Sequence, residues 1–439
     1  MQCKVAKFGG SSLADATQIR KVHDIITKDP AIKYVVPSAP GKRFPEDFKV
    51  TDMLYRCYDK CVKGENSDAD FTAIEERFNA IIRELGLQLS LEDEYTVIRK
   101  AFKIKLGRDF AASRGEYLSG KILSAYLGYP FIDAADVIFF DKNGCFDSER
   151  TDEVLSAKLK AMEHAVVPGF YGSMPNDTIK TFSRGGSDIT GSIVARAARA
   201  DMYENWTDVS GFLMADPRII KNPKTIPHIT YHELRELSYM GATVLHEDAI
   251  FPVRMEGIPI NIRNTNAPSD PGTTILAEMP ANDPVEVITG IAGKKGFAVV
   301  TIDKDMMNQE LGFGRRILWA FEKNGISFEH LPSGIDTMSV IVSESALENK
   351  KTALLADIIA LTNPDHIHVE YGIALIAVVG RGMVQTKGTA SKIFTAIYEN
   401  DVNIRMIDQG SSELNIIIGV KSEDFEKAMN AIYNAFVVA

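Results

Sequence analysis

The chain has 439 residues, of which 45% are apolar and 25% charged, and its formal net charge is −10. This length predicts about three domains, and the composition is typical of a globular protein. The negative charge argues against a nucleic-acid surface, which would be basic, but it allows a local basic pocket. No apolar run approaches the roughly 18 residues of a membrane span, and the N-terminus is unlike a signal peptide.

The four cysteines, Cys3, Cys57, Cys61 and Cys145, are few for a chain of this length. Cys57 and Cys61 are four positions apart on a predicted helix face, with no second pair and no nearby histidine. This pattern argues against a zinc site and favours reduced thiols in a cytoplasmic protein. We therefore expect no metal ion held in a cage of protein side chains.

The N-terminal segment predicts a strand over 4–8, a glycine turn at 9–12 and a helix over 15–27. A strand, a glycine-rich turn and a helix N-terminus together form a general cradle for phosphate groups. Lys7 lies at the end of the strand and would face the turn. The segment is neither a GxGxxG nor a GxxxxGK[ST] motif, so the pattern alone does not identify a nucleotide site.

A second strand over 33–36 leads into Pro-Ser-Ala-Pro-Gly, and a charged segment over 42–49 follows. This segment is either a lid over a site or a surface excursion. The stretch 51–107 is predicted to be helical, and the next helix runs over 108–127. A glycine inside a helix costs about 1 kcal/mol relative to alanine, so Gly115, beside Glu116, predicts the close approach of another segment or tight helix packing.

Further strands are predicted over 131–138, 165–169 and 201–209. Strands that alternate with helices over 1–280 predict an α/β sheet with helices on both faces. Ligands of such sheets bind beyond the carboxyl ends of the strands. Several candidate residues follow strands and are expected to converge at that edge, namely Lys7, Ser38, the Gly185 turn, Thr207 and Asp208.

The stretch 181–199 reads TFSRGGSDITGSIVARAAR and predicts a tight turn at its two glycines followed by a helix. Ser187 is predicted to cap this helix, whose inward face would hold Ile189, Ile193, Val194 and Ala197. The helix N-terminus, flanked by Arg184 and Asp188, suits a substrate with carboxylate or phosphate groups. A Gly-Gly loop with a solvated salt bridge remains the alternative.

The proline-rich segment 268–284 predicts an exit from the first domain. Beyond it the sequence predicts a strand, a helix, two strands and a helix, and then repeats this order. The first copy is predicted at 297–302, 314–324, 327–330, 338–343 and 347–361, and ends with a strand over 366–371. The second is predicted at 373–379, 389–400, 404–408, 413–420 and 423–436. Equivalent helices end at Asn324 and Asn400, which gives a period near 76 residues.

The motifs KFGGSSLAD, SAPG, RGE, VVPGF, SRGGSD, WTDVSGF, DPR and GATVLHE occur in the order seen in aspartate kinases, and the duplicated modules resemble ACT domains. The resemblance covers nearly the whole chain. It implies a three-layer α/β sandwich of the amino-acid kinase type over 1–280, followed by two ferredoxin-like α+β ACT modules at 285–371 and 372–439. It also implies the ATP-dependent phosphorylation of the L-aspartate β-carboxylate to 4-phospho-L-aspartate, the committed step toward lysine, threonine, methionine and diaminopimelate.

The resemblance assigns roles residue by residue. The catalytic residues would be Lys7, which stabilises charge on the transferring phosphoryl group, and Asp188, which orders the reacting centre. The residues that would hold aspartate are Ser38, Thr51, Glu116, on the α-ammonium group, and Arg184, on the α-carboxylate. The residues that would bind ATP are Lys7, Gly9, Gly10, Ser11, Thr207, Asp208 and Arg218.

Phosphoryl transfer depends mainly on positioning and cationic stabilisation, which agrees with these roles. The attacking carboxylate is already ionised at neutral pH, so the reaction needs no general base. Magnesium would be carried by the nucleotide phosphates and water.

The sequence departs from the family in two places. The family usually reads GAKVLHP, with a lysine that contacts ATP, where this chain has Thr243. We expect Lys221, Lys224 or an altered nucleotide pose to compensate, or the KM for ATP to be raised. The segment between Gly41 and Thr51 is also longer than in many relatives.

ACT modules commonly pair across subunits and bind an amino acid between them, which implies a homodimer or a dimer of dimers. The residues expected to line this effector site are Met307, Gly312, Phe313, Ser333, Asp336 and Thr337, and ordinary dimer packing is the alternative for each. Lysine is the expected feedback inhibitor, with threonine as the alternative.

Three functions remain open on the sequence alone. The first is an active, feedback-regulated aspartate kinase. The second is a kinase of glutamate, an acylated glutamate or carbamate, and the third is a non-catalytic amino-acid sensor. Glu116 and Arg184 favour a free amino acid, and the duplicated modules favour aspartate. The presence of Lys7, Arg184 and Asp188 together disfavours the sensor.

Overall fold

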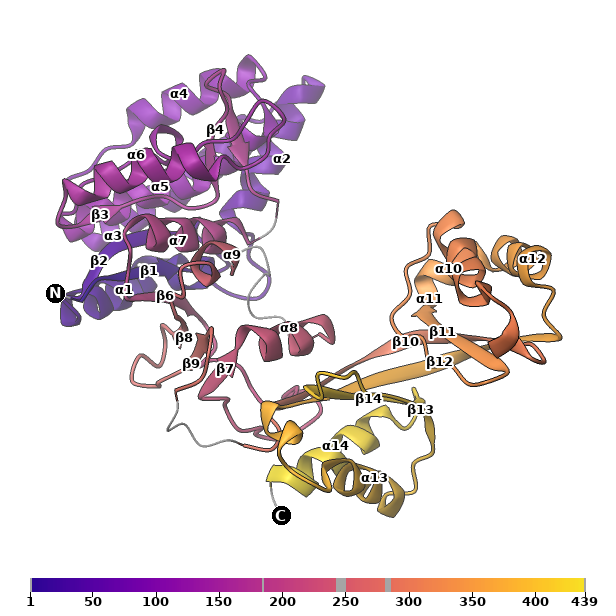
Figure 1. Ribbon diagram of the computed structural model, residues 1–439. Helices are drawn as coiled ribbons and strands as arrows, with labels where there is room; N and C mark the ends of the chain where they lie inside the picture. Colours follow the sequence, from indigo (N-terminus) through magenta and orange to yellow (C-terminus); the bar gives the residue numbers. More distant parts are fainter. Residues whose placement is uncertain (1, 184, 242–249, 281–285, 438–439) are drawn as a thin grey trace. The chain divides into compact units, whose positions relative to one another are not determined.

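The computed structural model describes residues 2–183, 185–241, 250–280 and 286–437 (Figure 1). The chain forms two compact units. The N-terminal unit comprises 1–212, 225–231 and 244–280, and the C-terminal unit comprises 213–224, 232–243 and 281–439. The units are therefore interleaved along the sequence, whereas the sequence predicted one continuous domain over 1–280.

A seven-stranded sheet forms the centre of the N-terminal unit, in the order β3-β2-β1-β6-β8-β9-β7. β1 (Lys4–Phe8) lies between β2 (Ile32–Pro37) and β6 (Met202–Thr207) and runs parallel to both. The outer strands are β3 (Ala165–Val166), β8 (Ile260–Asn264), β9 (Thr273–Leu276) and β7 (His228–Thr230). β9 is antiparallel to β8, whereas the other pairs of neighbours are parallel.

Helices cover both faces of this sheet, as predicted. Ala6 and Phe8 of β1 pack into one hydrophobic core with residues of the helices on one face, α1 (Ala16–Lys28), α2 (Val50–Lys63), α3 (Asp68–Leu85), α4 (Glu92–Lys103) and α5 (Arg108–Leu127). Successive side chains of a strand point to opposite faces, and α7 (Gly186–Ala197) packs on β1 from the other face. α6 (Ser148–Lys160) and α9 (Phe251–Arg254) pack against α7, which completes the three-layer α/β sandwich.

Several predicted elements are confirmed. β1 and α5 have the predicted bounds, and α1 begins one residue after Asp15, whose side chain accepts a hydrogen bond from the Gln18 amide at 2.9 Å. The helical stretch after residue 50 consists of α2, α3 and α4, and two of these end at left-handed glycines, Gly64 and Gly86. Local sequence patterns were sufficient to predict these elements, and the structure shows the residues that cap them.

The predicted strand over 131–138 is wrong. Phe131 makes only an isolated bridge to Val166, and Ala134–Asp136 form a short 3-10 helix. The Asp133 side chain accepts a hydrogen bond from the Ala135 amide at 3.0 Å and so turns the chain. The predicted exit over 268–284 is wrong in part, because it contains strand β9.

The predicted cap of α7 is also wrong. The N-cap residue is Gly185, in the left-handed region at φ 59°, and no side chain caps the helix. Ser187 lies inside the first turn. A Cβ on Gly186 would lie 2.3 Å from the ring of Phe170, so only glycine fits there. The predicted inward residues of the helix, Ile189, Ile193, Val194 and Ala197, are all buried.

The C-terminal unit contains a five-stranded sheet in the order β11-β10-β12-β14-β13. Its strands are β10 (Gly290–Asp303), β11 (Thr337–Ser343), β12 (His366–Val379), β13 (Ile404–Asp408) and β14 (Asn415–Lys421). Its main helices are α8 (Tyr231–Tyr239), α10 (Phe313–Lys323), α12 (Lys351–Thr362), α13 (Thr389–Glu399) and α14 (Phe425–Val437), with a short α11 (Glu344–Leu347).

The predicted repeat is visible in this sheet, where α10, β11 and α12 correspond in order to α13, β14 and α14. Two long strands join the repeats, because the start of β10, 290–295, pairs with the end of β12, 374–379. The predicted strands 366–371 and 373–379 are thus one strand, β12. The start of β10, which precedes the first repeat in the sequence, pairs with the part of β12 that belongs to the second repeat. The predicted strand 327–330 is reduced to a bridge between His330 and Ile341.

Within the described ranges, the model contains no helix that has both the length and the apolar character needed to cross a membrane.

Candidate functional site

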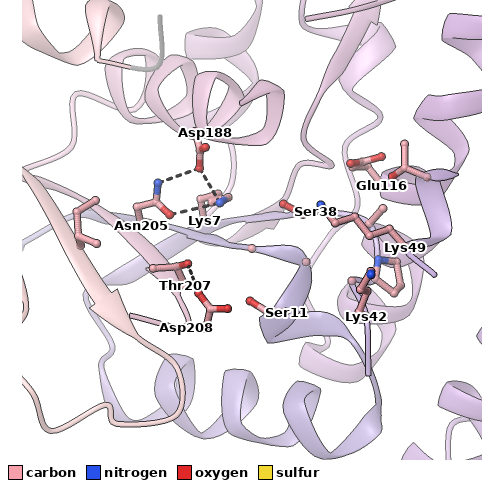
Figure 2. A pocket seen from close by; sticks show the side chains of 17 residues that line it. Lys7, Ser11, Ser38, Lys42, Lys49, Glu116, Asp188, Asn205, Thr207 and Asp208 are labelled. Atoms are coloured by element: carbon pink, nitrogen blue, oxygen red, sulfur yellow. Dashed lines mark hydrogen bonds and ion pairs between the residues drawn. The ribbon is translucent and has the colours of Figure 1, made fainter. Parts of the chain in front are cut away.

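A pocket of about 540 Å³ lies in the N-terminal unit at the carboxyl ends of β1, β2 and β6 (Figure 2). Its position is the one expected for a ligand site in an open α/β sheet. The residues that line it are Lys7, Gly9, Gly10, Ser11, Ser38, Ala39, Pro40, Gly41, Lys42, Lys49, Thr51, Glu116, Asp188, Asn205, Thr207, Asp208 and Ile262.

Lys7, Asp188 and Asn205 form a connected polar group at one end of this pocket (Figure 2). The Lys7 Nζ lies 2.6 Å from Asp188 Oδ1 and donates to Asn205 Oδ1 at 3.3 Å. The Asn205 amide donates to the same Asp188 oxygen at 2.8 Å. Lys7 is only 7% exposed, and a buried ammonium group requires such partners. The group therefore fixes the position of the Lys7 ammonium group inside the pocket, paired with the Asp188 carboxylate.

Two glycine-containing turns meet backbone to backbone beside this charge. The Gly41 amide donates to the Gly10 carbonyl at 2.7 Å. A Cβ on Gly41 would lie 2.6 Å from the Gly10 carbonyl carbon, and one on Gly10 would lie 2.9 Å from the Ala39 carbonyl oxygen. Neither turn has room for a side chain at these positions. The Gly9 amide donates to the Trp206 carbonyl at 2.9 Å, so a ligand would meet the amides of the two residues after it.

Glu116 brings a buried carboxyl group to the pocket from α5. It is 5% exposed, and no described residue gives its Oε2 atom a hydrogen-bond partner. Burial raises the pKa of Glu116 to about 8, although the Ala39 amide partly offsets this rise. A buried carboxyl group with an unpartnered oxygen atom is suited to bind a cationic group of a ligand.

The predicted close approach at Gly115 is confirmed. A Cβ on Gly115 would lie 2.7 Å from the Cβ of Ala39, so the turn after β2 packs directly on α5. This packing brings Ser38 and Glu116 to the same pocket. The Ser38 amide is fixed in turn, since it donates to the Phe8 carbonyl at 3.0 Å.

The pocket brings together most of the residues predicted from the sequence. Those that line it are Lys7, Gly9, Gly10, Ser11, Ser38, Thr51, Glu116, Asp188, Thr207 and Asp208. The Thr207 hydroxyl donates to Asp208 Oδ1 at 3.2 Å. Arg184 and Thr243 lie outside the described residues. Arg218 belongs to the C-terminal unit, where its guanidinium group pairs with Asp216 at 2.6 Å.

Sequence reasoning missed three polar residues of the pocket, Asn205, Lys42 and Lys49. Asn205 lies opposite Lys7 in the parallel register of β1 and β6, so knowledge of the strand pairing would have identified it. Lys42 and Lys49 belong to the charged segment after β2, and the view in Figure 2 shows them beside the pocket with Ser38 and Glu116. The number of lysines in that segment was the available signal.

The predicted effector residues lie on two loops of the C-terminal unit that contact each other. The Met306 amide donates to Asp336 Oδ1 at 3.0 Å, and the Lys304 amide donates to the Asp336 carbonyl at 2.8 Å. The Gly334 amide donates to the Thr337 carbonyl at 2.7 Å. Phe313 is buried in the hydrophobic core of the first repeat. The effector role of these residues remains a prediction.

The chain matches two known protein families. The amino acid kinase family matches residues 2–264, and an ACT domain matches residues 376–436. Aspartokinase 3 of Bacillus subtilis (strain 168) is 38% identical, over 99% of this chain and 98% of that protein.

Solved structures agree with these matches. The crystal structure of aspartate kinase from Clostridium acetobutylicum is 53% identical with a TM-score of 0.91, and the match covers 99% of this chain and 100% of that one. E. coli aspartokinase III in complex with aspartate and ADP is 23% identical with a TM-score of 0.73, covering 99% of each chain, a likeness that concerns the fold.

Proposed function

The chain belongs to the amino acid kinase family, among the aspartate kinases, and we propose that its pocket transfers the γ-phosphoryl group of ATP to the β-carboxylate of L-aspartate. The products are ADP and 4-phospho-L-aspartate. The single observation that carries this proposal is the shared pocket of Lys7, the glycine turn at 9–11 and the buried Glu116 carboxyl group. These groups are complementary to a phosphate chain and to an amino acid.

The transfer needs positioning and charge stabilisation more than proton transfer. One β-carboxylate oxygen forms a bond to the γ-phosphorus while the bond from that phosphorus to the bridging oxygen of ADP breaks, so the charge moves onto ADP. Lys7 stabilises the charge that builds up on the transferring group. Asp188 and Asn205 hold the Lys7 ammonium group in place through contacts of 2.6 and 3.3 Å.

The nucleotide phosphates are proposed to lie on the glycine turn 9–11, on the amides of Gly10 and Ser11, because the Gly9 amide already donates to the Trp206 carbonyl at 2.9 Å. Thr207 and Asp208 are proposed to contact the nucleotide. Magnesium commonly binds through one or two carboxylates together with substrate phosphates. The described residues contain no group of three or more His, Cys, Asp or Glu side chains suited to hold a metal ion. Asp208 lines the pocket and could bind a magnesium ion that enters with the nucleotide. This ion would neutralise part of the phosphate charge. Arg218 is also proposed to contact the nucleotide phosphates.

Aspartate is proposed to bind with its α-ammonium group on Glu116 and its α-carboxylate on Arg184. The unpartnered Oε2 atom of Glu116 supports the first contact, because an ammonium group would supply both the missing hydrogen bond and the missing charge. Ser38 and Thr51 line the same pocket and are proposed to bind the remaining polar atoms of the amino acid.

We also propose that the paired repeats of the C-terminal unit are ACT modules that bind a feedback inhibitor, lysine, at a homodimer or dimer-of-dimers interface. The enzyme would act in the cytoplasm on the route to lysine, threonine, methionine and diaminopimelate. The Clostridium relative is described as an allosteric enzyme. Isothermal titration of the purified protein with lysine and with threonine tests this proposal. If only threonine gives a heat of binding, threonine and not lysine is the inhibitor. If neither amino acid gives heat, neither is the inhibitor.

A hydroxamate assay tests the catalytic proposal, since hydroxylamine traps an acyl phosphate as it forms. The assay is run with MgATP and, separately, L-aspartate, L-glutamate, N-acetylglutamate and carbamate. We expect product with aspartate. Product with another acid only would support another amino-acid kinase, and no product with any acid would support the sensor.

The matched variants are Lys7→Met and Lys33→Met. Lys7→Met should lower kcat by about 10² to 10³, the range seen when one charge-stabilising donor is removed. Lys33 lies on the neighbouring strand β2 and pairs with Glu163 at 3.4 Å, away from the pocket lining. Lys33→Met should therefore retain activity, and equal losses in the two variants would contradict the role of Lys7.

A further inference from the structure

A buried arginine on α3 lies behind the pocket. The core-facing side of α3 carries Phe71, Ile74, Phe78, Ile81 and Ile82, and the same side carries Arg77, which is 5% exposed. Burying a charge among apolar side chains is costly unless the charge is paired and hydrogen-bonded. The groups that pair with Arg77 therefore indicate why an arginine, and not an apolar residue, occupies this position.

The Arg77 guanidinium group contacts two loops of the chain, one at Ala14 and the other, between β2 and α2, at Gly41 and Asp47. Its Nη2 atom donates to the Ala14 carbonyl at 2.9 Å and to the Gly41 carbonyl at 2.7 Å. Its Nη1 atom donates to Asp47 Oδ2 at 2.8 Å. A guanidinium group is planar and presents its donors in a fixed fork, so it also fixes the spacing of the groups that it binds.

Two of these partners belong to the turns that form the proposed phosphate and aspartate sites. Ala14 directly follows the 3-10 helix Gly10–Leu13 of the first turn, and Gly41 ends the second turn. The two turns already touch through the Gly41 amide and the Gly10 carbonyl, at 2.7 Å. Arg77 connects the same two turns a second time, from the side away from the pocket lining.

The third partner anchors the charged segment 42–49. Asp47 is 8% exposed and also accepts hydrogen bonds from the Arg43 amide at 3.0 Å and from Arg43 Nε at 2.8 Å. The Arg43 and Arg77 guanidinium groups hold the pKa of Asp47 well below its usual range. Lys42 and Lys49, at the two ends of this segment, line the pocket. The contacts of Asp47 therefore hold the segment 42–49 in place and keep both lysines close to the pocket.

We infer that Arg77 is a positioning residue of this enzyme, which sets the relative placement of the two glycine turns and the segment 42–49 through Ala14, Gly41 and Asp47. This inference rests on the proposed function, because it concerns the same pocket. Arg77 does not line the pocket. It acts on substrates only through the segments that it binds, and its removal should disturb the binding of ATP and aspartate together.

The test compares Arg77→Lys and Arg77→Ala with the unaltered enzyme in the hydroxamate assay. Lysine keeps the charge but loses the fork, so Arg77→Lys should lower kcat/KM about tenfold to a hundredfold for both substrates, a loss typical of a displacement near 1 Å. Arg77→Ala should lose more. Added guanidinium ion, far below concentrations that unfold proteins, should restore part of the activity that Arg77→Ala loses. It should not raise the activity of the unaltered enzyme.

Arg99→Ala is the matched control. Arg99 on α4 holds the Glu75 side chain of the same helix α3 at 2.7 and 2.9 Å, so this variant also removes an arginine pair from α3, but one outside the pocket. Its KM values should stay unchanged and should not respond to guanidinium ion. Thermal unfolding of every variant is recorded, and all kinetics are measured well below each midpoint.

Asp47→Asn keeps the inference testable if Arg77→Ala does not fold, since asparagine keeps the shape and removes the charge. It should raise KM less than Arg77→Lys does. A folded Arg77→Lys with unaltered kcat and KM would overturn the inference, as would losses in Arg99→Ala equal to those in Arg77→Ala. Failure of the unaltered enzyme to phosphorylate aspartate would instead reject the proposed function.

Discussion

Glu116 shows how one buried side chain can carry a substrate preference. Its carboxyl group lies in the pocket with one oxygen atom unpartnered among the described residues, and burial raises its pKa to about 8. Such a group is neutral for much of the physiological range until a cation arrives. The α-ammonium group of an amino acid favours the ionised form, so binding and loss of the Glu116 proton should be coupled.

We predict that the KM for aspartate depends on pH through Glu116. Below a pKa of about 8, aspartate must displace a proton from this carboxyl group, so KM should rise by up to tenfold for each pH unit below that value. At higher pH, KM should be constant. Initial rates at saturating MgATP measure this between about pH 6 and about pH 9, where the aspartate carboxylates stay ionised and its ammonium group protonated.

Glu116→Gln is the control for this prediction. It should raise KM and remove its pH dependence. It should also stabilise the free protein near pH 9, because a carboxyl group whose pKa is raised on folding loses its contribution to stability as pH rises from about 4 to about 8. A glutamine variant with the pH profile of the unaltered enzyme would refute the role of Glu116.

Among the secondary-structure elements, the two glycine turns show why backbone contact matters at this site. The Gly41 amide donates to the Gly10 carbonyl at 2.7 Å, and a Cβ on Gly41 would lie 2.6 Å from the carbon of that carbonyl group. Real Cβ atoms do not approach this closely, so any side chain at Gly41 must separate the turns. The turns carry Ser11 and Ser38 of the proposed sites, which makes their separation a functional change.

We therefore predict that Gly41→Ala lowers kcat/KM for MgATP and aspartate by about a hundredfold, the scale of a displacement near 1 Å. Gly64→Ala is the matched control. Gly64 ends α2 with φ 76° and has no atom within 4 Å of an added Cβ, so its substitution should cost about 1 kcal/mol of stability without loss of activity. Steady-state kinetics and thermal unfolding of both variants decide the matter.

Helix α8 is an element whose attachment the sequence did not reveal. Its Glu233 is fully buried and accepts hydrogen bonds from the Thr289 hydroxyl and, at 3.2 Å, from the Arg381 amide. The Arg381 guanidinium group lies 3.3 Å from the same carboxylate. Further along, Glu236 accepts a hydrogen bond from Asn415 at 2.6 Å. These contacts bind α8 to the second repeat of the C-terminal unit, whose core also includes Ile288 and Ile291.

We predict that Glu233→Ala lowers the unfolding free energy of the C-terminal unit by about 3–5 kcal/mol, because it removes a fully buried carboxylate that pairs with the Arg381 guanidinium group. Glu348→Ala, on an exposed residue of the same unit, should change stability by less than about 0.5 kcal/mol. Urea unfolding followed by circular dichroism measures both. A change in Glu233→Ala as small as that in the control would contradict the prediction.

For the molecule as a whole, the important feature is the interleaving of the two units. The stretch 213–224 belongs to the C-terminal unit, where Ala215 and Ile220 are part of the hydrophobic core of the second repeat. The Met214 carbonyl accepts a hydrogen bond from the Ile291 amide at 2.7 Å, and the Lys224 amide donates to the Tyr433 hydroxyl at 2.9 Å. Residues 281–439 alone therefore lack part of their own core.

We predict that a fragment of residues 281–439 is less stable than the same region in the full chain. The loss of Ile220 alone removes about 1.5–3 kcal/mol of apolar burial. In the full chain, Ile220→Ala should destabilise the C-terminal unit by about 2–5 kcal/mol. Urea midpoints of the fragment, the variant and the full chain test this, and a fragment as stable as the full chain would show that 213–224 is dispensable.

The sequence alone determined the elements and residues that depend on local signals. Local sequence patterns predicted β1, α1 and α5, and the order of short motifs predicted the family and a set of residues that line one pocket. The repeat after residue 290 was predictable because each copy carries its own hydrophobic period. Gly115 also indicated a close packing contact. Glycine inside a helix lowers the stability of the helix, so its presence suggests that a neighbouring segment leaves no room for a side chain.

Only the tertiary structure decided which distant segments meet. The register of β1 and β6 places Asn205 opposite Lys7, and the burial of Arg77 depends on two loops that lie 30 to 63 positions earlier in the sequence. The pairing of β10 with β12 and the attachment of 213–224 to the C-terminal unit likewise leave no local pattern. The physical reason is that periodicity shows which face of an element is buried, whereas register and packing depend on the partner that buries it.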